Sequence, residues 1–262
     1  DGRYARLSAE YRFNQGLMFT GELRRQQFES AGDGVEMFEG DDASGALVSA
    51  SERRGYGGFS GEFTGVTARL LRTFGEGHEW SNELRYDVGE NSYDQDGVRL
   101  FTLPAAPSIY EDVSNGRESA TINFASAYTR PMSGEAKLRA GYEAEIIDLE
   151  FDNRVLRGPS PTTLVVDPTV TNRFQADQSV QAIYGTYERP FGPVSAQFGL
   201  RVEYVTLDLD QITSGVQVSH DYFRLYPSFH VVRQLSETQE LRASYSRRVQ
   251  RPQPGDLNPF LI

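Results

Sequence analysis

The fold is decided by stretches such as Gln197-Phe198-Gly199-Leu200-Arg201-Val202-Glu203-Tyr204, in which apolar and polar side chains alternate. Residues 139–146 show the same alternation. Successive side chains of a β-strand point to opposite faces, so each such segment has one apolar face and one polar face. The segments run to about ten residues or more, which is long enough for a tilted strand to cross a bilayer. The pattern therefore predicts membrane-spanning β-strands.

The alternating segments come in pairs along the chain. The expected strands cover residues 4–13, 17–28, 61–74, 78–90, 117–130, 136–150, 177–189, 194–208, 220–234 and 240–249. Short turns join the two members of each pair. Longer segments separate the first pairs, and we expect loops over residues 29–58, over the stretch that holds Asp94, Asp96 and Glu111, and over residues 152–175.

Short turns at one end and long loops at the other end are typical of outer-membrane barrels. The predicted fold class is therefore all-β, an antiparallel meander of about ten strands that forms part of a large transmembrane β-barrel. About ten strands do not close a barrel of roughly 22 strands, the size of large outer-membrane transporters. We expect the chain to be a piece of a longer protein.

Composition limits the classes of function. The formal net charge is −11, the opposite of the charge that a nucleic-acid partner favours, so we expect no nucleic-acid binding. The sequence has no cysteine, which excludes disulfides and thiolate metal sites. No apolar run approaches the ~18 residues of a transmembrane helix. The mean hydropathy of −0.51 is compatible with a barrel, because polar side chains that face the lumen lower the average.

The sequence offers little for metal binding or catalysis. His78 lies on one expected strand and His220 and His230 lie on another, and no pair has the spacing of metal ligands. Asp94-Gln95-Asp96-Gly97 resembles the start of a calcium loop without its distant glutamate, so we interpret these acids as solvated loop tips; calcium in an outer loop stays open. The nucleophile elbow, the P-loop and the dinucleotide fingerprint are absent from the sequence. We therefore expect no enzyme activity, no metal and no cofactor.

The segment Ser244–Pro252, followed by Asp256–Phe260, is the most specific one in the chain. It resembles a motif of TonB-dependent outer-membrane receptors, in which a strand leads into an outer loop. The motif residues here are Tyr245, Ser246, Arg247, Arg248, Arg251, Pro252, Leu257, Asn258, Pro259 and Phe260. Residues 74–80, 199–204 and 226–230 are similar to further segments of the same family, and the likeness covers roughly residues 60 to 260.

The resemblance implies what surrounds the chain. Residues 1–262 would be a partial barrel domain, with a plug domain and the C-terminal strands of the same polypeptide outside this chain. The expected location is the outer membrane of a Gram-negative bacterium, in contact with its lipid and lipopolysaccharide. The expected activity is uptake of a scarce small-molecule ligand, coupled to the TonB energy complex through an N-terminal region. An iron-siderophore, cobalamin, a sugar and a peptide all stay open as the ligand.

Five side chains are candidates for facing the lumen and contacting a ligand or a plug. They are Arg201, Glu203, Arg224, Tyr226 and Arg242. Opposite charges on one strand face also pair with neighbouring strands, so a wall of paired charges is the simpler interpretation. For the arginines of the terminal motif we favour a structural role, although arginine is also suited to binding phosphate groups.

Two alternatives use the same alternation. A passive, porin-like barrel would need neither a plug nor coupling. A soluble secreted β-sandwich would stack its apolar faces against a second layer of protein in a dry interior. The apolar faces contain small residues such as Ala9, Gly21 and Ala140, which suit contact with lipid at least as well as a packed core.

Overall fold

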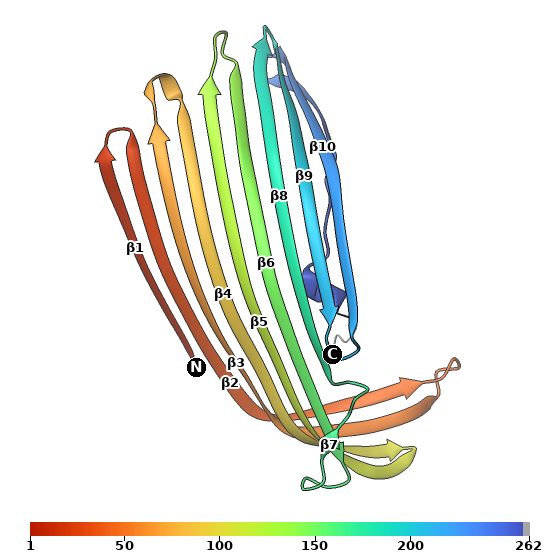
Figure 1. The fold of residues 1–262 in the computed structure, drawn as a ribbon. Helices are drawn as coiled ribbons and strands as arrows, with labels where there is room; N and C mark the ends of the chain where they lie inside the picture. The colour runs from red at the N-terminus through yellow and green to blue at the C-terminus, as the bar shows by residue number, and fades with distance from the viewer. Residues whose placement is uncertain (259–262) are drawn as a thin grey trace.

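The structure is a computed structural model that describes residues 1–258 (Figure 1). Its strands form one antiparallel sheet in the order β1-β2-β3-β4-β5-β6-β8-β9-β10-β11, with β7 paired to β6. The predicted all-β meander of about ten strands is confirmed. Their bounds are β1 Gly2–Asn14, β2 Leu17–Asp41, β3 Leu47–Thr73, β4 Glu79–Leu103, β5 Ala105–Pro131, β6 Lys137–Gly158, β7 Val165–Val166, β8 Asn172–Phe191, β9 Val194–Gln211, β10 Val216–Ser236 and β11 Gln239–Ser246.

Two short 3₁₀ turns complete the secondary structure of the described residues, η1 (Gly75–Gly77) and η2 (Pro254–Leu257). Among residues 1–258, none of the helical segments has the length and apolar character needed to span a membrane. Short turns join the strand pairs at one end of the sheet, and the long hairpins lie at the other end (Figure 1). We call these the turn end and the mouth end.

The expected loop over residues 29–58 is wrong. β2 and β3 stay paired from Leu17↔Arg72 to Gly40↔Ser49, so only a tip of a few residues is a turn. The alternation of apolar side chains ends where a strand leaves the membrane, whereas backbone hydrogen bonding continues wherever two neighbouring strands remain adjacent. From Glu62 to Leu47, β3 extends for on the order of 50 Å of strand.

The other expected loops are also partly strand. Asp94 and Asp96 are exposed but lie in β4 and not at loop tips, and Glu111 lies in β5. In the expected loop over residues 152–175, β6 continues to Gly158 and β8 begins at Asn172. This leaves an irregular segment of residues 159–171 that contains β7. The reason is the same in each case, because the hairpins extend beyond the apolar alternation.

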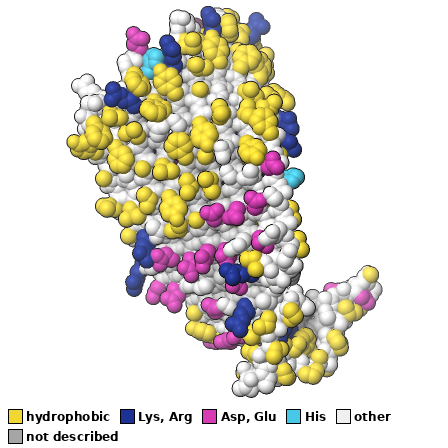
Figure 2. All heavy atoms as spheres, viewed as in Figure 1, with side chains coloured by type: hydrophobic (Ala, Val, Ile, Leu, Met, Phe, Trp, Pro, Cys, Tyr) yellow, Lys and Arg dark blue, Asp and Glu magenta, His cyan; other side chains and the backbone are white. Residues whose placement is uncertain are grey.

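The two faces of the sheet differ as the alternation predicts. One face, the apolar face, carries large side chains that nothing covers among the described residues; Leu7 is 70% exposed, Ile183 65% and Leu241 59%. Figure 2 shows these apolar side chains gathered over the half of the sheet toward the turn end, bounded on the mouth side by acidic side chains. Glu62, Glu90, Glu118 and Glu150 form one row of that boundary, each in register with the next. We call it the acidic row.

This arrangement does not support the soluble β-sandwich. A sandwich requires a second layer on the apolar face, and within residues 1–258 that face has no such cover. The apolar zone fits a band in contact with lipid, and the acidic row marks where that band ends.

The opposite face, the polar face, receives the last described residues. After β11 the chain passes along this face as residues 247–258, which we call the return segment. A Cβ added to Gly255 would lie 3.1 Å from Cζ of Phe151, so η2 packs directly on the sheet. Leu149, Phe174 and Ala176 form a small buried cluster beneath it.

Candidate functional site

The polar face carries a network of ion pairs around Glu203, whose side chain is only 5% exposed. Nε of Arg201 donates to Oε1 of Glu203 at 2.6 Å, and Nη1 of Arg201 donates to Oε2 of Glu143 at 2.5 Å. Glu143 is in β6 and Arg201 is in β9, so the contact crosses β8. The β8 residue in register between Glu143 and Glu203 is Ala182, whose small side chain leaves room for it.

The return segment completes this network. Arg251 donates through Nη2 to the second oxygen of Glu203 and through Nε to the hydroxyl of Tyr222 at 3.1 Å. Glu203 therefore lies between two guanidinium groups, which stabilise its buried charge. We call Glu143, Arg201, Glu203, Tyr222 and Arg251 the wall network.

A second set of contacts anchors the far end of the return segment. Nδ2 of Asn172 donates to Oδ1 of Asn258 at 3.1 Å, and Nε2 of Gln211 donates to the same oxygen at 3.4 Å. All three side chains are buried. The return segment is thus bound to the polar face by an ion pair near its middle and by amide hydrogen bonds at its end.

Gly65 in β3 makes room for a further ion pair on the polar face. Nη2 of Arg24 in β2 donates to Oδ1 of Asp87 in β4 at 2.6 Å, across the intervening strand. A Cβ added to Gly65 would lie 2.5 Å from both Nε of Arg24 and Oδ1 of Asp87. Paired charges that span three strands therefore line this part of the wall as well.

The structure brings together some of the predicted site residues and separates others. Arg201 and Glu203 are in contact, while Arg224 and Tyr226 lie opposite them in the register of β10. The guanidinium of Arg224 lies 5.1 Å from the centroid of the Tyr222 ring. Arg242 is separate, because it lies in β11 and pairs with Glu240. A ligand-binding role for these five residues stays a prediction.

The described residues of the terminal motif lie at the end of β11 and along the return segment. Tyr245 and Ser246 end β11, and Arg247 and Arg248 are exposed. Arg251 to Asn258 belong to the return segment, while Pro259 and Phe260 lie outside the described residues. Sequence reasoning missed Glu203 and Tyr222 as partners of Arg251 in this motif, because only the pairing of strands distant in sequence places them beside it.

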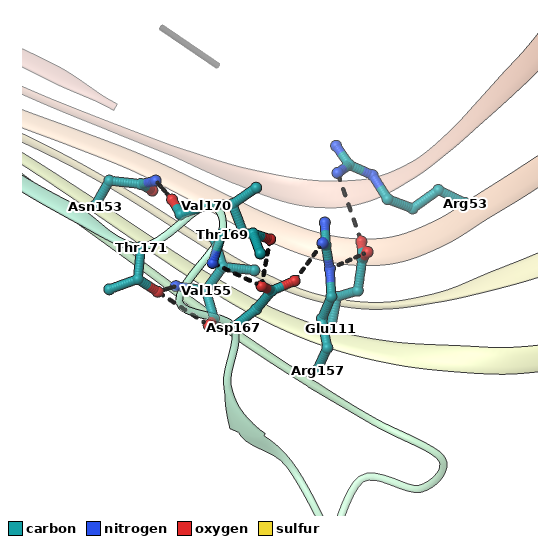
Figure 3. Close-up of polar contacts among 9 residues, drawn as sticks. All are labelled: Arg53, Glu111, Asn153, Val155, Arg157, Asp167, Thr169, Val170 and Thr171. Atoms are coloured by element: carbon teal, nitrogen blue, oxygen red, sulfur yellow. Dashed lines mark hydrogen bonds and ion pairs between the residues drawn. The ribbon is translucent and has the colours of Figure 1, made fainter. Parts of the chain in front are cut away.

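A second polar cluster lies at the mouth end (Figure 3). Its centre is Glu111 in β5, whose side chain is 5% exposed. Nε of Arg157 in β6 donates to Oε1 of Glu111 at 3.0 Å, and Nη1 of Arg53 in β3 lies 3.9 Å from Oε2. Arg157 also donates to Oδ2 of Asp167 at 2.7 Å, and Arg53 pairs with Glu36 in β2 at 2.7 Å. We call these five charged residues the mouth relay.

The relay orders the segment 159–171. The amide of Thr169 donates to Oδ1 of Asp167 at 2.9 Å, and Nδ2 of Asn153 donates to the carbonyl oxygen of Val170 at 2.5 Å. Hydrogen bonds from the Thr169 hydroxyl and amide, together with Arg157, hold the pKa of the Asp167 carboxyl below its ordinary value. An Asp-Pro-Thr sequence is typical of turns, and this was the available signal for an ordered segment.

Comparisons with known proteins agree with this geometry. The sequence model of the Outer membrane protein beta-barrel family matches residues 72–262. The chain belongs to the outer membrane protein beta-barrel family. Its location is therefore the outer membrane of a Gram-negative bacterium, with the apolar face toward lipid and the polar face toward the lumen. No curated protein sequence matches the chain.

Solved structures of receptor barrels share the fold of this outer-membrane chain. The unliganded ferric citrate transporter FecA superposes with a TM-score of 0.51 at 11% identity, covering 93% of this chain and 43% of FecA. The siderophore receptor PiuA from Acinetobacter baumannii also gives a TM-score of 0.51, at 10% identity, covering 93% of this chain and 47% of PiuA. The chain thus spans less than half the length of either receptor. The resemblance to TonB-dependent receptor barrels, first identified in the motifs, is confirmed at the level of fold.

Proposed function

We propose that the chain forms part of the barrel wall of a TonB-dependent receptor that takes up a scarce small molecule, of the iron-siderophore kind, into the periplasm. Residues 1–262 would be a partial barrel domain. Further strands and a plug domain of the same polypeptide would complete it, and the TonB complex would supply energy through the plug. The chain itself would contribute wall, mouth and return segment, and no catalytic step.

The observation that carries this proposal is the mouth relay. It links strands β2, β3, β5 and β6 and the segment 159–171 through charged contacts around one buried carboxylate. A mouth whose side chains are already ordered before a ligand arrives binds with a smaller loss of conformational entropy. Such a surface suits selective recognition more than free diffusion through a passive pore. FecA and PiuA, which share the fold, are named for a ferric citrate complex and a siderophore.

The wall network supports the same proposal. Its charges are paired with one another and with the return segment, so part of the lumen is occupied by the chain itself. A lumen narrowed in this way favours gated passage. The remaining wall, with pairs such as Arg24 with Asp87, offers a polar surface on which a plug domain would dock.

The test is whole-cell uptake by the full-length protein, with radioactive iron supplied as citrate, catecholate and hydroxamate complexes. We expect uptake of at least one complex that is lost when TonB is deleted. Uptake that persists without TonB, together with steady conductance of the purified protein in planar bilayers, would instead establish the passive barrel.

A matched pair of variants connects the test to the mouth. Glu111→Gln removes the central charge of the relay and is expected to reduce the TonB-dependent uptake severalfold. Asp112→Asn alters the next residue of β5, which projects to the other face. It is expected to leave uptake unchanged, and equal losses in both variants would argue against recognition at the relay.

A further inference from the structure

Two arginines face each other directly at the mouth end. Arg53 in β3 and Arg99 in β4 are register partners, so their side chains leave the polar face side by side. Like charges placed opposite each other on neighbouring strands repel and destabilise the pair. The two guanidinium groups also flank one aromatic ring, because their Cζ atoms lie 6.0 Å and 4.5 Å from the centroid of Phe38 in β2.

Arg53 has carboxylate partners, whereas Arg99 has none within ion-pair distance among the described residues. Arg53 pairs with Glu36 at 2.7 Å and approaches Glu111 at 3.9 Å. Arg99 makes no ion pair with any residue from 1 to 258, and its guanidinium lies over the face of the Phe38 ring. Its neighbour on the same strand face is Gly97, which has no side chain to offer. In the described part of the chain, the guanidinium of Arg99 therefore has no carboxylate within ion-pair distance, although Glu111 is the register partner of Gly97.

Within residues 1–258, both arginines also have a hydrogen-bond donor without an acceptor. Nε of Arg53 and Nε of Arg99 are both buried, and neither has an acceptor among the described residues. Buried polar groups are nearly always hydrogen-bonded, so two such donors on adjacent side chains indicate that an acceptor from another molecule belongs there. A group that supplies negative charge and oxygen acceptors together would remove both deficits.

We propose that Arg53, Arg99 and Phe38 form an anion-binding site at the mouth, which takes a carboxylate group of the transported small molecule. This deepens the proposed function and rests on it. A guanidinium matches a planar carboxylate through two parallel hydrogen bonds, and Arg99 has its charge free for that geometry. The charge of Arg53 is compensated by Glu36 and Glu111, so Arg53 would mainly orient the anion through its hydrogen-bond donors. Phe38 shields the guanidinium of Arg99 from water, which strengthens its attraction for an anion.

The position of the site favours a dissolved anion over the phosphate group of a membrane lipid. The three side chains lie on the polar face, toward the lumen, and they are farther out along β3 than Glu62 of the acidic row. The phosphate groups of membrane lipid contact the apolar face and do not reach them. Arg99, which makes no ion pair within residues 1–258, supplies the positive charge that an anion would meet at this position.

The test is calorimetric titration of the full-length protein in detergent with citrate, with trimethyl citrate as the uncharged control at equal ionic strength. Wild-type protein is expected to bind citrate and not its ester. Arg99→Gln is expected to weaken citrate binding at least tenfold. Arg99→Lys, which keeps the charge without the planar fork, is expected to give an intermediate loss and guards against a variant that simply fails to fold.

The matched control is Arg54→Gln, one residue along β3 from Arg53 and on the other face, where Arg54 pairs with Glu52. Its affinity for citrate should stay within twofold of the wild type. Equal losses in Arg54→Gln and Arg99→Gln, binding of the ester as tight as that of citrate, or no citrate binding by the wild type would each overturn the site.

Failure of the site and failure of the proposed function are distinguishable. If uptake depends on TonB but citrate binding does not depend on Arg99, the anion site is overturned and the receptor function stands. If citrate binding depends on Arg99 but uptake persists without TonB, the site stands as a feature of a passive barrel.

Discussion

Two glutamates at different heights of the same wall have nearly the same surroundings. Glu203 in the wall network and Glu111 in the mouth relay are each 5% exposed, and each lies between two arginines. Glu203 is held closely, by Arg201 at 2.6 Å and by Arg251 of the return segment. Glu111 is held more loosely, at 3.0 Å by Arg157 and 3.9 Å by Arg53.

The difference lies in whether the neighbouring arginines are all paired. In the wall network two carboxylates meet two guanidinium groups, and the network is closed. In the mouth relay three carboxylates meet two guanidinium groups, while Arg99, the register partner of Arg53, makes no ion pair within residues 1–258. A closed network anchors a segment, whereas an open one retains capacity for a ligand. The comparison therefore separates a structural use of buried charge from a recognition use within one sheet.

The largest effect should come from removing Glu203, which anchors the return segment to the wall network. Glu203→Ala removes the buried carboxylate between Arg201 and Arg251, so that Arg201 keeps only Glu143 and Arg251 keeps no carboxylate among the described residues. Loss of one partner of a buried ion pair costs about 3 kcal/mol or more. We expect a large drop in the free energy of unfolding, measured by denaturant titration of the full-length protein in lipid. Glu240→Ala, in the exposed pair with Arg242, is the control and should change stability by less than about 1 kcal/mol.

The close approach of β3 and β4 near the mouth is the next test. A Cβ at Gly55 would overlap the carbonyl oxygen of Asp96, so Gly55→Ala must displace backbone and should cost roughly 1–3 kcal/mol. Gly32→Ala is the matched control, because a Cβ there meets no atom within 4 Å. Amide hydrogen exchange of β3 and β4 should increase in the first variant alone. Unchanged exchange in Gly55→Ala would mean that the mouth tolerates displacement of its strands.

A substitution in the mouth relay should affect mainly the segment 159–171 and not the whole sheet. Glu111→Gln removes the charge that Arg157 and Arg53 share, and we expect faster proteolysis within residues 159–171 with a loss of about 1–2 kcal/mol in global stability. Protease cleavage mapped by mass spectrometry measures the first effect. A drop in stability as large as that of Glu203→Ala would contradict the distinction between anchor and recognition surface.

The smallest effect concerns pH at Asp167. Its pKa is lowered in the folded protein, so its contribution to stability is present above the ordinary value of about 4 and is lost as pH falls through the folded value. The protection of the amides of residues 159–171 from hydrogen exchange, relative to an unfolded peptide at the same pH, should therefore stay high at neutral pH. It should fall only under strong acid. Asp167→Asn should remove this dependence, and a fall in protection near pH 6 in the unaltered protein would contradict it.

Particular residues show how far the sequence reached. The alternation over residues 197–204 predicted a strand with Arg201 and Glu203 on one face, and the structure has both in contact on the polar face. The same approach assigned residues 29–58 to a loop, because acidic residues and glycines interrupt the apolar alternation there. Glu111 was also placed in an expected loop, yet it lies in β5 and is buried. The signal reports contact with lipid and not the extent of strand pairing.

The sequence by itself determined which side of each strand meets lipid and which meets the lumen, because side chains alternate strictly along an extended chain. Its terminal motif also indicated the family. Only the tertiary structure decided which charges meet. Arg251 reaches Glu203 across 48 residues, and Arg53 stands beside Arg99 through the register of two neighbouring strands. Such contacts depend on the pairing of distant segments, which a pattern of local side chains does not encode.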